Sequence, residues 1–174
     1  ATIRFQIDAA TANAARHLAA RLDTTPAVVL LAAHAALIGG LSGGTDFAIG
    51  LPAAERLRPE TADIVALLVE TLVVRADLAG ISGTGLIRRM ATEMRTVLAA
   101  RPLPVDMLVE RLALPRDAGR TPLFQTMFSH DRAGDHRLDL GQGLAGRLDA
   151  ARTTGARTDL SLMLADSADG GLDG

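Results

Sequence analysis

The sequence predicts a mixed α/β fold in which helices pack on a β-sheet. Segments whose apolar residues recur at three- and four-residue steps alternate along the chain with short runs of aliphatic and β-branched residues. The chain has 174 residues, of which 48% are hydrophobic, enough for one domain or one large lobe with a real core. Only 2% are aromatic, so we expect a core built from aliphatic side chains and methionine.

The periodicity of the apolar residues sets the expected order of elements. Alternating or continuous aliphatic residues indicate strands, and apolar residues on one helical face indicate helices. In chain order we expect a strand at 3–7, helices at 11–22 and 26–38, a strand at 46–51, a short helix at 60–66, a strand at 67–75, helices at 84–99 and 105–112, and strands at 123–129, 144–148 and 158–165. Residues 131–137 are polar and are expected to form a turn.

The helix at 26–38 is expected at the centre of the fold. Thr25 followed by Pro26 predicts its start, because a threonine side chain caps free backbone N–H groups and proline fits the first helical turn. The helix is apolar almost all round, which is typical of a buried helix. We expect Gly39 and Gly40 to end it.

The last hairpin is expected to be incomplete. Asp169 and the two glycines after it are typical of a hairpin turn, and they follow the strand at 158–165. The chain stops three residues after that turn. We therefore expect the second strand to be missing and the chain to be truncated at this point.

Composition argues against several classes of function. The net charge of −2 creates no strong field for nucleic acid or for an anionic membrane. The longest apolar run, residues 27–38, is interrupted by His34 and is too short to cross a bilayer. The first residues lack the pattern of a signal peptide, so we expect a soluble, cytoplasmic protein. There is no cysteine, which excludes disulfides and thiolate metal sites.

No catalytic residue and no metal site is predicted from the residues themselves. None of the four histidines lies at the spacing of a metal-binding pair. His34 lies in the apolar helix and is expected to be buried and hydrogen-bonded, whereas His17, His130 and His136 are expected on the surface. The glycine-rich segment 39–44 lacks the lysine of a phosphate-binding loop, so we expect a turn there.

Three segments carry motifs at a recognisable spacing. Residues 45–56 run Thr-Asp-Phe-Ala-Ile-Gly-Leu-Pro-Ala-Ala-Glu-Arg, which is similar to Asp-x-x-x-Gly-x-Pro-x-x-x-Arg. Residues 64–75 run Ile-Val-Ala-Leu-Leu-Val-Glu-Thr-Leu-Val-Val-Arg, which is similar to Ile-Gly-x-Phe-Val-Asn-Thr-Leu-x-x-Arg. Residues 116–123 run Arg-Asp-Ala-Gly-Arg-Thr-Pro-Leu, which is similar to Arg-Asp-x-Ser-Arg-Asn-Pro-Leu. With weaker similarities at 25–37, 104–110 and 158–162, the chain resembles the condensation domain of nonribosomal peptide synthetases, in its C-terminal lobe.

This resemblance implies a fold and a reaction. The family's fold is an α/β sandwich of the chloramphenicol acetyltransferase type, a two-lobed pseudodimer in which each lobe has a mixed sheet with packed helices. We expect residues 1–174 to be the C-terminal lobe. In this family, carrier proteins bring substrates on phosphopantetheine arms to a tunnel between the lobes, where an acceptor amine attacks a donor thioester to form an amide. The expected partners are the N-terminal lobe, peptidyl carrier proteins and an adjacent adenylation domain.

The resemblance also implies roles for residues. The family's catalytic motif, His-His-x-x-x-Asp-Gly, belongs to the N-terminal lobe and does not occur in this sequence. The chain is therefore expected to contribute no catalytic residue, to bind no cofactor itself and to be inactive alone. The residues expected to line the tunnel are Gly50, Pro52, Glu70 and Thr71. The motif residues expected to have structural roles are Arg75, Arg116, Asp117, Arg120, Pro122 and Asp159.

Departures from the family pattern leave alternatives open. Glu70 stands where the family has asparagine, and Val65 stands where it has glycine. A carboxylate buried at Glu70 would pair with an arginine or take up a proton. These changes favour, as an alternative, a non-catalytic condensation-like module that recruits a partner enzyme. An epimerisation domain of the same fold is a further alternative, although the Thr-Leu-x-x-Arg ending of residues 64–75 fits the condensation type better.

Overall fold

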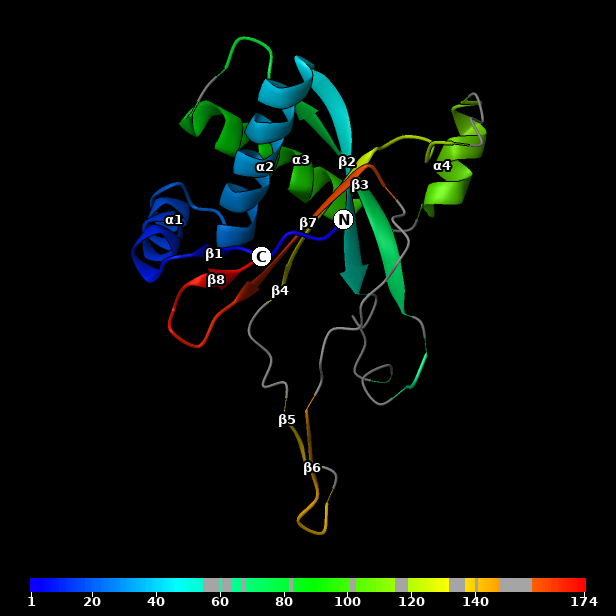
Figure 1. The fold of residues 1–174 in the computed structure, drawn as a ribbon. Coiled ribbons are helices and arrows are strands. Elements are labelled where there is room, and N and C mark those ends of the chain that lie inside the picture. Colours follow the sequence, from blue (N-terminus) through cyan, green and yellow to red (C-terminus); the bar gives the residue numbers. More distant parts are fainter. Residues whose placement is uncertain are drawn as a thin grey trace.

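The fold is one mixed six-stranded sheet with helices packed against it (Figure 1). The computed structural model describes residues 1–54, 60, 64–66, 68–81, 83–100, 103–114, 119–131, 137–139, 141–147 and 158–174. The helices are α1 (Ala9–Arg21), α2 (Pro26–Ser42), α3 (Thr84–Ala99) and α4 (Val105–Arg111). The strands are β1 (Gln6–Ile7), β2 (Asp46–Ala54), β3 (Val69–Asp77), β4 (Thr126–Asp131), β5 (Arg137–Asp139), β6 (Ala145–Arg147), β7 (Leu160–Asp166) and β8 (Leu172–Asp173).

The sheet has the strand order β1-β8-β7-β4-β2-β3, so its two edges are β1 and β3. β2 pairs with β3 in antiparallel fashion and with β4 in parallel fashion, and β4 pairs with β7 in parallel fashion. The short strands β8 and β1 complete the sheet as antiparallel neighbours. β5 and β6 form a separate two-stranded hairpin, which lies apart from the main sheet in Figure 1. This arrangement confirms the predicted α/β class with a mixed sheet and packed helices.

Side-chain alternation gives the sheet two different faces. Ile49 and Val74 are partners in the register of β2 and β3, and both are fully buried in the core beneath α2 and α3. We call this side the core face. Because successive side chains on a strand point to opposite sides, the residues between them lie on the other side, which we call the second face. The second face comprises Ala48, Gly50, Pro52, Thr71, Val73, Arg75, Met127, Ser129, Ser161 and Met163.

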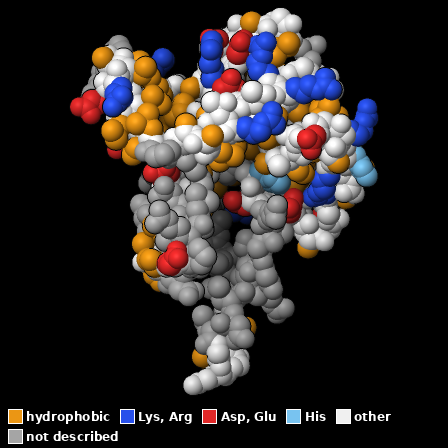
Figure 2. Space-filling view, turned by 180° about the vertical axis from the view of Figure 1, so that it is seen from behind, with side chains coloured by type: hydrophobic (Ala, Val, Ile, Leu, Met, Phe, Trp, Pro, Cys, Tyr) orange, Lys and Arg blue, Asp and Glu red, His pale blue; other side chains and the backbone are white. Residues whose placement is uncertain are grey.

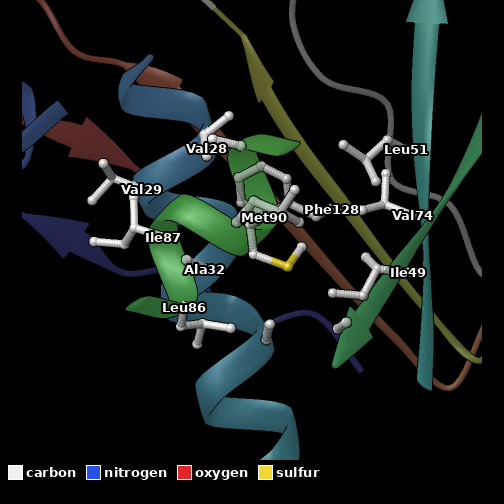
Figure 3. Packing of buried hydrophobic residues seen from close by; sticks show 14 of the residues in the cluster. Val28, Val29, Ala32, Ile49, Leu51, Val74, Leu86, Ile87, Met90 and Phe128 are labelled. Atoms are coloured by element: carbon white, nitrogen blue, oxygen red, sulfur yellow. The ribbon is translucent and has the colours of Figure 1, made fainter. Parts of the chain in front are cut away.

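The core lies between the sheet and the helices α2 and α3. Figure 3 shows Met90 of α3 beside Phe128 of β4, with Ile49 and Val74 of the sheet on the other side of the cluster. Met90 is 0% exposed and Phe128 is 2% exposed. Most other members of this cluster are aliphatic, as the low aromatic content predicts.

Helix α2 occupies the predicted central position. Its residues Val28, Leu31 and Ala35 are at most 6% exposed. Thr25 caps the helix by accepting a hydrogen bond from the Val28 N–H at 3.4 Å, and Pro26 is its first residue, as predicted. Among the described residues, no single helix is long and apolar enough to cross a membrane, and α1 and α2 reach that length only as a pair bent by 108°.

The prediction that Gly39 and Gly40 end α2 is wrong. The helix continues to Ser42, and Gly43 ends it in the left-handed conformation with φ of 70°. Its N–H group bonds to the carbonyl oxygen of Gly39 at 2.9 Å, as in a typical C-terminal cap. Glycine inside a helix is tolerated, so only the residue that adopts positive φ marks the end.

The expectation of a missing second strand in the last hairpin is also wrong. β8 is present as the two residues Leu172–Asp173, which pair with both β7 and β1. The turn is tight, because the Asp169 carboxylate accepts a hydrogen bond from the Gly171 N–H at 2.9 Å and Gly170 has a φ of 87°. A tight turn leaves enough chain for a short strand. β1 is correspondingly shorter than predicted, because its partner β8 has only two residues.

The remaining predictions differ from the structure mainly at element ends. α3 has the predicted bounds, and the strand predicted at 123–129 begins only at Thr126 because Leu123 adopts a φ of 78°. β5 was not predicted, since it begins inside the expected polar turn. Of the helix expected at 60–66, residues 61–63 lie outside the described residues and residues 64–66 are not helical. Most of the turn expected at 131–137 lies outside the described residues.

Candidate functional site

The second face brings together three of the four residues expected to line a tunnel. Pro52 and Thr71 are direct partners in the register of β2 and β3, and Gly50 lies two residues before Pro52 on the same side. Glu70 pairs with Ala53 and lies on the core face, near the start of β3. Glu70 and Thr71 therefore point in opposite directions, as neighbours on a strand must.

Gly50 is required by the close approach of an aromatic ring. A Cβ atom at this position would lie only 2.6 Å from Phe124 Cε2. Phe124 is 6% exposed and covers the second face at Gly50, whereas Phe128 lies on the core face. Phe124 and Phe128 lie on opposite faces although they are four residues apart, because the positive φ of Leu123 precedes Phe124 and β4 starts only at Thr126.

The middle of the second face has two features that the sequence did not indicate. Met163 is 66% exposed although β7 is an inner strand of the sheet. Its register partner on β4 is Ser129. The Ser129 hydroxyl oxygen is shielded from solvent and has no hydrogen-bond partner in the part of the chain that the structure describes. No periodicity or motif marks either residue, so a sequence pattern could not have found them.

An ion pair lies at the far end of the second face. The Arg75 guanidinium donates two hydrogen bonds to the Asp46 carboxylate, from Nε at 2.8 Å and from an Nη atom at 2.7 Å. Hydrogen bonding to Arg75 lowers the pKa of Asp46, and the same contact raises the pKa of Arg75. Both side chains are more than half exposed, so this pair orients two strand ends and adds little stability.

The other motif residues lie near the start of β4. Arg120 is exposed, and the Pro122 carbonyl oxygen accepts a hydrogen bond from the Phe124 N–H at 3.1 Å. The Asp159 N–H bonds to the Gln125 carbonyl oxygen at 2.9 Å, which joins the segments that lead into β4 and β7. Arg116 and Asp117 lie outside the described residues. The proposed structural roles of these motif residues stay predictions.

His34 is buried and hydrogen-bonded, as predicted. It is 2% exposed, and its Nε2 atom lies 2.9 Å from the Thr126 hydroxyl oxygen on the core face. Its ring centroid lies 5.8 Å from that of Phe128. Burial lowers the pKa of His34, because the charged form would lose its hydration. The residue therefore belongs to the core and not to a reaction site.

The expectation that His130 lies on the surface is wrong. Its side chain is 10% exposed and its Nε2 atom lies 3.3 Å from the Asp166 carboxylate. The same carboxylate oxygen accepts from Arg16 of α1 at 3.2 Å, and Arg16 also donates to the Gly170 carbonyl oxygen at 2.8 Å. His130 lies on the core face opposite α1, which explains its burial. His17 is exposed as predicted, and His136 lies outside the described residues.

The arrangement around Asp166 fits a structural role. Arg16 and His130 share one carboxylate oxygen, so the histidine has no separate carboxylate that would orient it as a base. The cluster instead joins α1, β4, β7 and the turn before β8. The sequence could not predict it, because the three residues are far apart in the chain and meet only in the folded sheet.

Comparison with known proteins identifies the family. The model of the condensation domain matches residues 1–143 of this chain. The chain belongs to the condensation domain family. The chain is 37% identical over 169 residues to phosphinothricin tripeptide synthetase PhsB of Streptomyces viridochromogenes, covering 95% of this chain and 14% of that protein. It is 30% identical over 171 residues to surfactin synthase subunit 1 of Bacillus subtilis, covering 98% of this chain and 5% of that protein.

Solved condensation domains share the fold. The condensation domain from the monacolin K polyketide synthase MokA matches with a TM-score of 0.79 and 20% identity, over 98% of this chain and 40% of that one. The four-domain nonribosomal peptide synthetase AB3403 matches with a TM-score of 0.87 and 19% identity, over 98% of this chain and 14% of that one. These similarities confirm the predicted sandwich of the chloramphenicol acetyltransferase type. The chain spans well under half the length of each of these relatives.

Proposed function

We propose that this chain is the C-terminal lobe of a condensation domain in a nonribosomal peptide synthetase. One observation carries the proposal: a chain of this family that covers 40% of a solved condensation domain has no His-His-x-x-x-Asp-Gly motif anywhere in its sequence. A lobe of this kind needs the preceding lobe to supply the catalytic histidine. The second face, with its exposed side chains, is then one side of the tunnel between the lobes.

The proposed reaction forms an amide from a thioester and an amine. The nitrogen of a carrier-bound acceptor attacks the carbonyl carbon of a carrier-bound donor thioester. The carbon–nitrogen bond forms, the carbon–sulfur bond breaks, and the proton lost by the nitrogen balances the proton gained by the departing thiol. The phosphopantetheine arms of the carrier proteins are part of the substrates, so this chain needs no cofactor of its own.

Residues of the second face shape the proposed tunnel. Gly50 gives the Phe124 ring the space that it occupies, so at this position the ring forms the surface of the second face. Pro52 and Thr71 stand side by side at the same level of the sheet. Glu70 lies on the core face near the start of β3, and its proposed contribution is to the end of the tunnel at that point. We retain all four as proposed tunnel residues.

Apolar surface outside the sheet supports further partners. α4 lies beside the edge strand β3 (Figure 1), and only Val109 of this helix is buried. Leu103, Met107 and Leu112 around it are 44%, 44% and 53% exposed. Figure 2 shows hydrophobic side chains gathered at the side of the molecule where α4 lies. The preceding lobe, carrier proteins and a neighbouring adenylation domain are the proposed partners that would cover such surface.

The function is tested by comparing the whole polypeptide with this chain. The polypeptide that carries both lobes should join a carrier-bound donor to a carrier-bound acceptor, with the amide detected by intact-protein mass spectrometry. The 174-residue chain alone should form no product from the same loaded carriers. Amide formation by the chain alone would contradict the assignment, because the sequence lacks the His-His-x-x-x-Asp-Gly motif that the proposal assigns to the preceding lobe.

A recruitment module is the second candidate, favoured by the changes at Glu70 and Val65. The X-domain from teicoplanin biosynthesis, which has also been solved in complex with OxyB, matches this chain with a TM-score of 0.86 and 20% identity. A fold likeness at this identity does not separate the two functions. The preceding lobe does: an intact His-His-x-x-x-Asp-Gly motif supports condensation, whereas a broken motif with binding of a partner enzyme supports recruitment.

A further inference from the structure

Four residues in the middle of the second face form a block with unusual chemistry. The register of β4 and β7 pairs Met127 with Ser161 and Ser129 with Met163. Met163 is 66% exposed on an inner strand, where large apolar side chains are normally covered. The block therefore presents apolar surface at a place where the fold itself does not require it.

The block also contains a hydroxyl group without a partner. The Ser161 hydroxyl lies 2.9 Å from that of Thr158, so it has a hydrogen-bond partner within the chain. The Ser129 hydroxyl oxygen is shielded from solvent and finds no partner within the described residues. A buried hydroxyl left unbonded destabilises a protein by about 1–3 kcal/mol. A buried hydroxyl that does not stabilise the fold and has no partner there is a candidate for a hydrogen bond to a ligand.

The block is continuous with the proposed tunnel residues. Gly50 pairs with Met127 in the parallel register of β2 and β4. Pro52 lies two residues after Gly50 on the same side of β2 and pairs with Thr71 of β3. The proposed tunnel residues and the block thus adjoin each other on the second face at Gly50 and Met127. No side chain of the block carries a charge.

We propose that this block, Met127, Ser129, Ser161 and Met163, is a substrate subsite for a neutral, apolar group. The inference rests on the proposed condensation function and names the part of the substrate that this lobe would contact. The apolar side chain or acyl chain of one carrier-bound substrate packs against the two methionines. A carbonyl oxygen of that substrate accepts a hydrogen bond from the Ser129 hydroxyl. A single donor within an uncharged patch suits a small ligand with one acceptor better than a second protein surface.

Methionine suits such a subsite because it adapts to its ligand. Its unbranched side chain has several rotatable bonds and a polarisable sulfur, so it repacks around groups of different size. The Ser129 hydroxyl is shielded from solvent in this structure, and its register partner Met163 is exposed, so the Met163 side chain has the space to repack around a substrate.

The size preference of the subsite gives the first test. In the two-lobed polypeptide, kcat/KM is measured with carriers loaded with alanine, leucine or phenylalanine as donor and, separately, as acceptor. Met163→Ala should shift the ratio of kcat/KM for large over small substrates upward by about tenfold, and Met163→Phe should shift it downward. Leu41→Ala on α2 removes an exposed apolar side chain from a helix that packs on the opposite, core face of the sheet, and it should leave the ratio unchanged.

The outcomes separate this inference from the proposed function. If the wild-type polypeptide forms the amide but neither Met163 variant changes the ratio of kcat/KM for large over small substrates, the proposed subsite is wrong and the proposed function stands. A wild-type polypeptide that has an intact catalytic motif and forms no amide overturns the proposed function and the subsite with it. Because Met163 is exposed, neither variant is expected to unfold the chain.

The Ser129 hydroxyl gives a second test, in which kcat/KM should fall while the thermal midpoint of unfolding should not. Ser129→Ala should lower kcat/KM by roughly three- to tenfold through loss of one hydrogen bond. The same variant should leave the thermal midpoint of the chain unchanged or raised, since an unbonded buried hydroxyl is removed. Ser42→Ala, which removes a hydroxyl bonded to the Ile38 carbonyl oxygen at 2.8 Å, is the control for kcat/KM and should not change it. A lowered midpoint with unchanged kcat/KM for Ser129→Ala would overturn the assignment of this hydroxyl.

Discussion

The two faces of the sheet differ in how far their side chains are buried and bonded within the chain. On the core face, Ile49, Val74 and Phe128 are at most 2% exposed and pack against α2 and α3. On the second face, Met163 is 66% exposed and the Ser129 hydroxyl has no partner among the described residues. The core face is explained by burial of apolar area within this chain. The exposed Met163 and the unbonded Ser129 hydroxyl are the observations from which we propose that the tunnel lies at the second face.

The largest expected effect is on the core face. Phe128→Ala should destabilise the chain by about 3–5 kcal/mol, because it removes a buried ring and leaves a cavity. Met163→Ala on the second face should change the free energy of unfolding by less than about 0.5 kcal/mol. Urea denaturation followed by circular dichroism measures both. Comparable losses for the two variants would show that the second face is part of the core.

Gly50 tests whether packing also constrains the second face. Gly50→Ala places a Cβ atom 2.6 Å from the Phe124 ring, so the ring must move, at an expected cost of about 1–3 kcal/mol. A Cβ atom at Gly40 would meet nothing within 4 Å, so Gly40→Ala within α2 should be neutral or stabilising. The free energies of unfolding of Gly50→Ala, Phe124→Ala and the double variant give the coupling. Strict additivity would show that the two residues do not interact.

The buried His34 should make stability depend on pH. Burial places its folded pKa below the ordinary value of 6.5, so the unfolded chain binds the proton more readily. Stability is therefore fully present above pH 6.5, declines as the pH falls from 6.5 towards the folded pKa, and the decline ends below that pKa. Denaturation curves measured at several pH values above and below the ordinary histidine pKa of 6.5 check this.

The matched variants assign that pH dependence to one residue. His34→Gln should flatten the decline, even if it lowers stability overall through loss of the bond to Thr126. His17→Gln changes an exposed histidine on α1 and should keep the decline of the parent chain. An unchanged slope in His34→Gln would mean that another group titrates.

The smallest expected effect is at the exposed ion pair. Arg75→Gln removes both hydrogen bonds to Asp46, and the pair is open to water and salt. The change in stability should stay within the error of a denaturation curve, at low and at high salt. A clear, salt-dependent loss would show that the pair has a structural role in the isolated chain.

Much of the core face could be predicted from the sequence. The three- and four-residue periodicity of α3 gave its bounds, and Thr25 with Pro26 gave the start of α2. The end of α2 and the strand β8 were mispredicted, because both depend on local backbone conformation at Gly43 and Gly170 rather than on apolar pattern. Periodicity reports burial, so it is informative wherever burial decides the structure.

The candidate site could be predicted only in part. The motif residues Gly50, Pro52 and Thr71 fall on one face, and strand alternation alone separates Thr71 from Glu70. Ser129 and Met163 were not predicted, because their proximity depends on the pairing of β4 with β7 across 34 positions of the chain. The cluster around Asp166 depends on the same pairing. Register between distant strands is the information that this sequence did not provide.

A labelling experiment tests most directly whether a preceding lobe covers the second face. The chain has no cysteine, so Met163→Cys introduces a unique thiol on that face, and His17→Cys introduces one on exposed α1. Maleimide labelling rates at both positions are measured by mass spectrometry in the 174-residue chain and in the two-lobed polypeptide. We expect position 163 to react rapidly in the chain and much more slowly in the polypeptide, with no change at position 17. Equal rates at position 163 in both proteins would contradict the central claim that this face is completed by a second lobe.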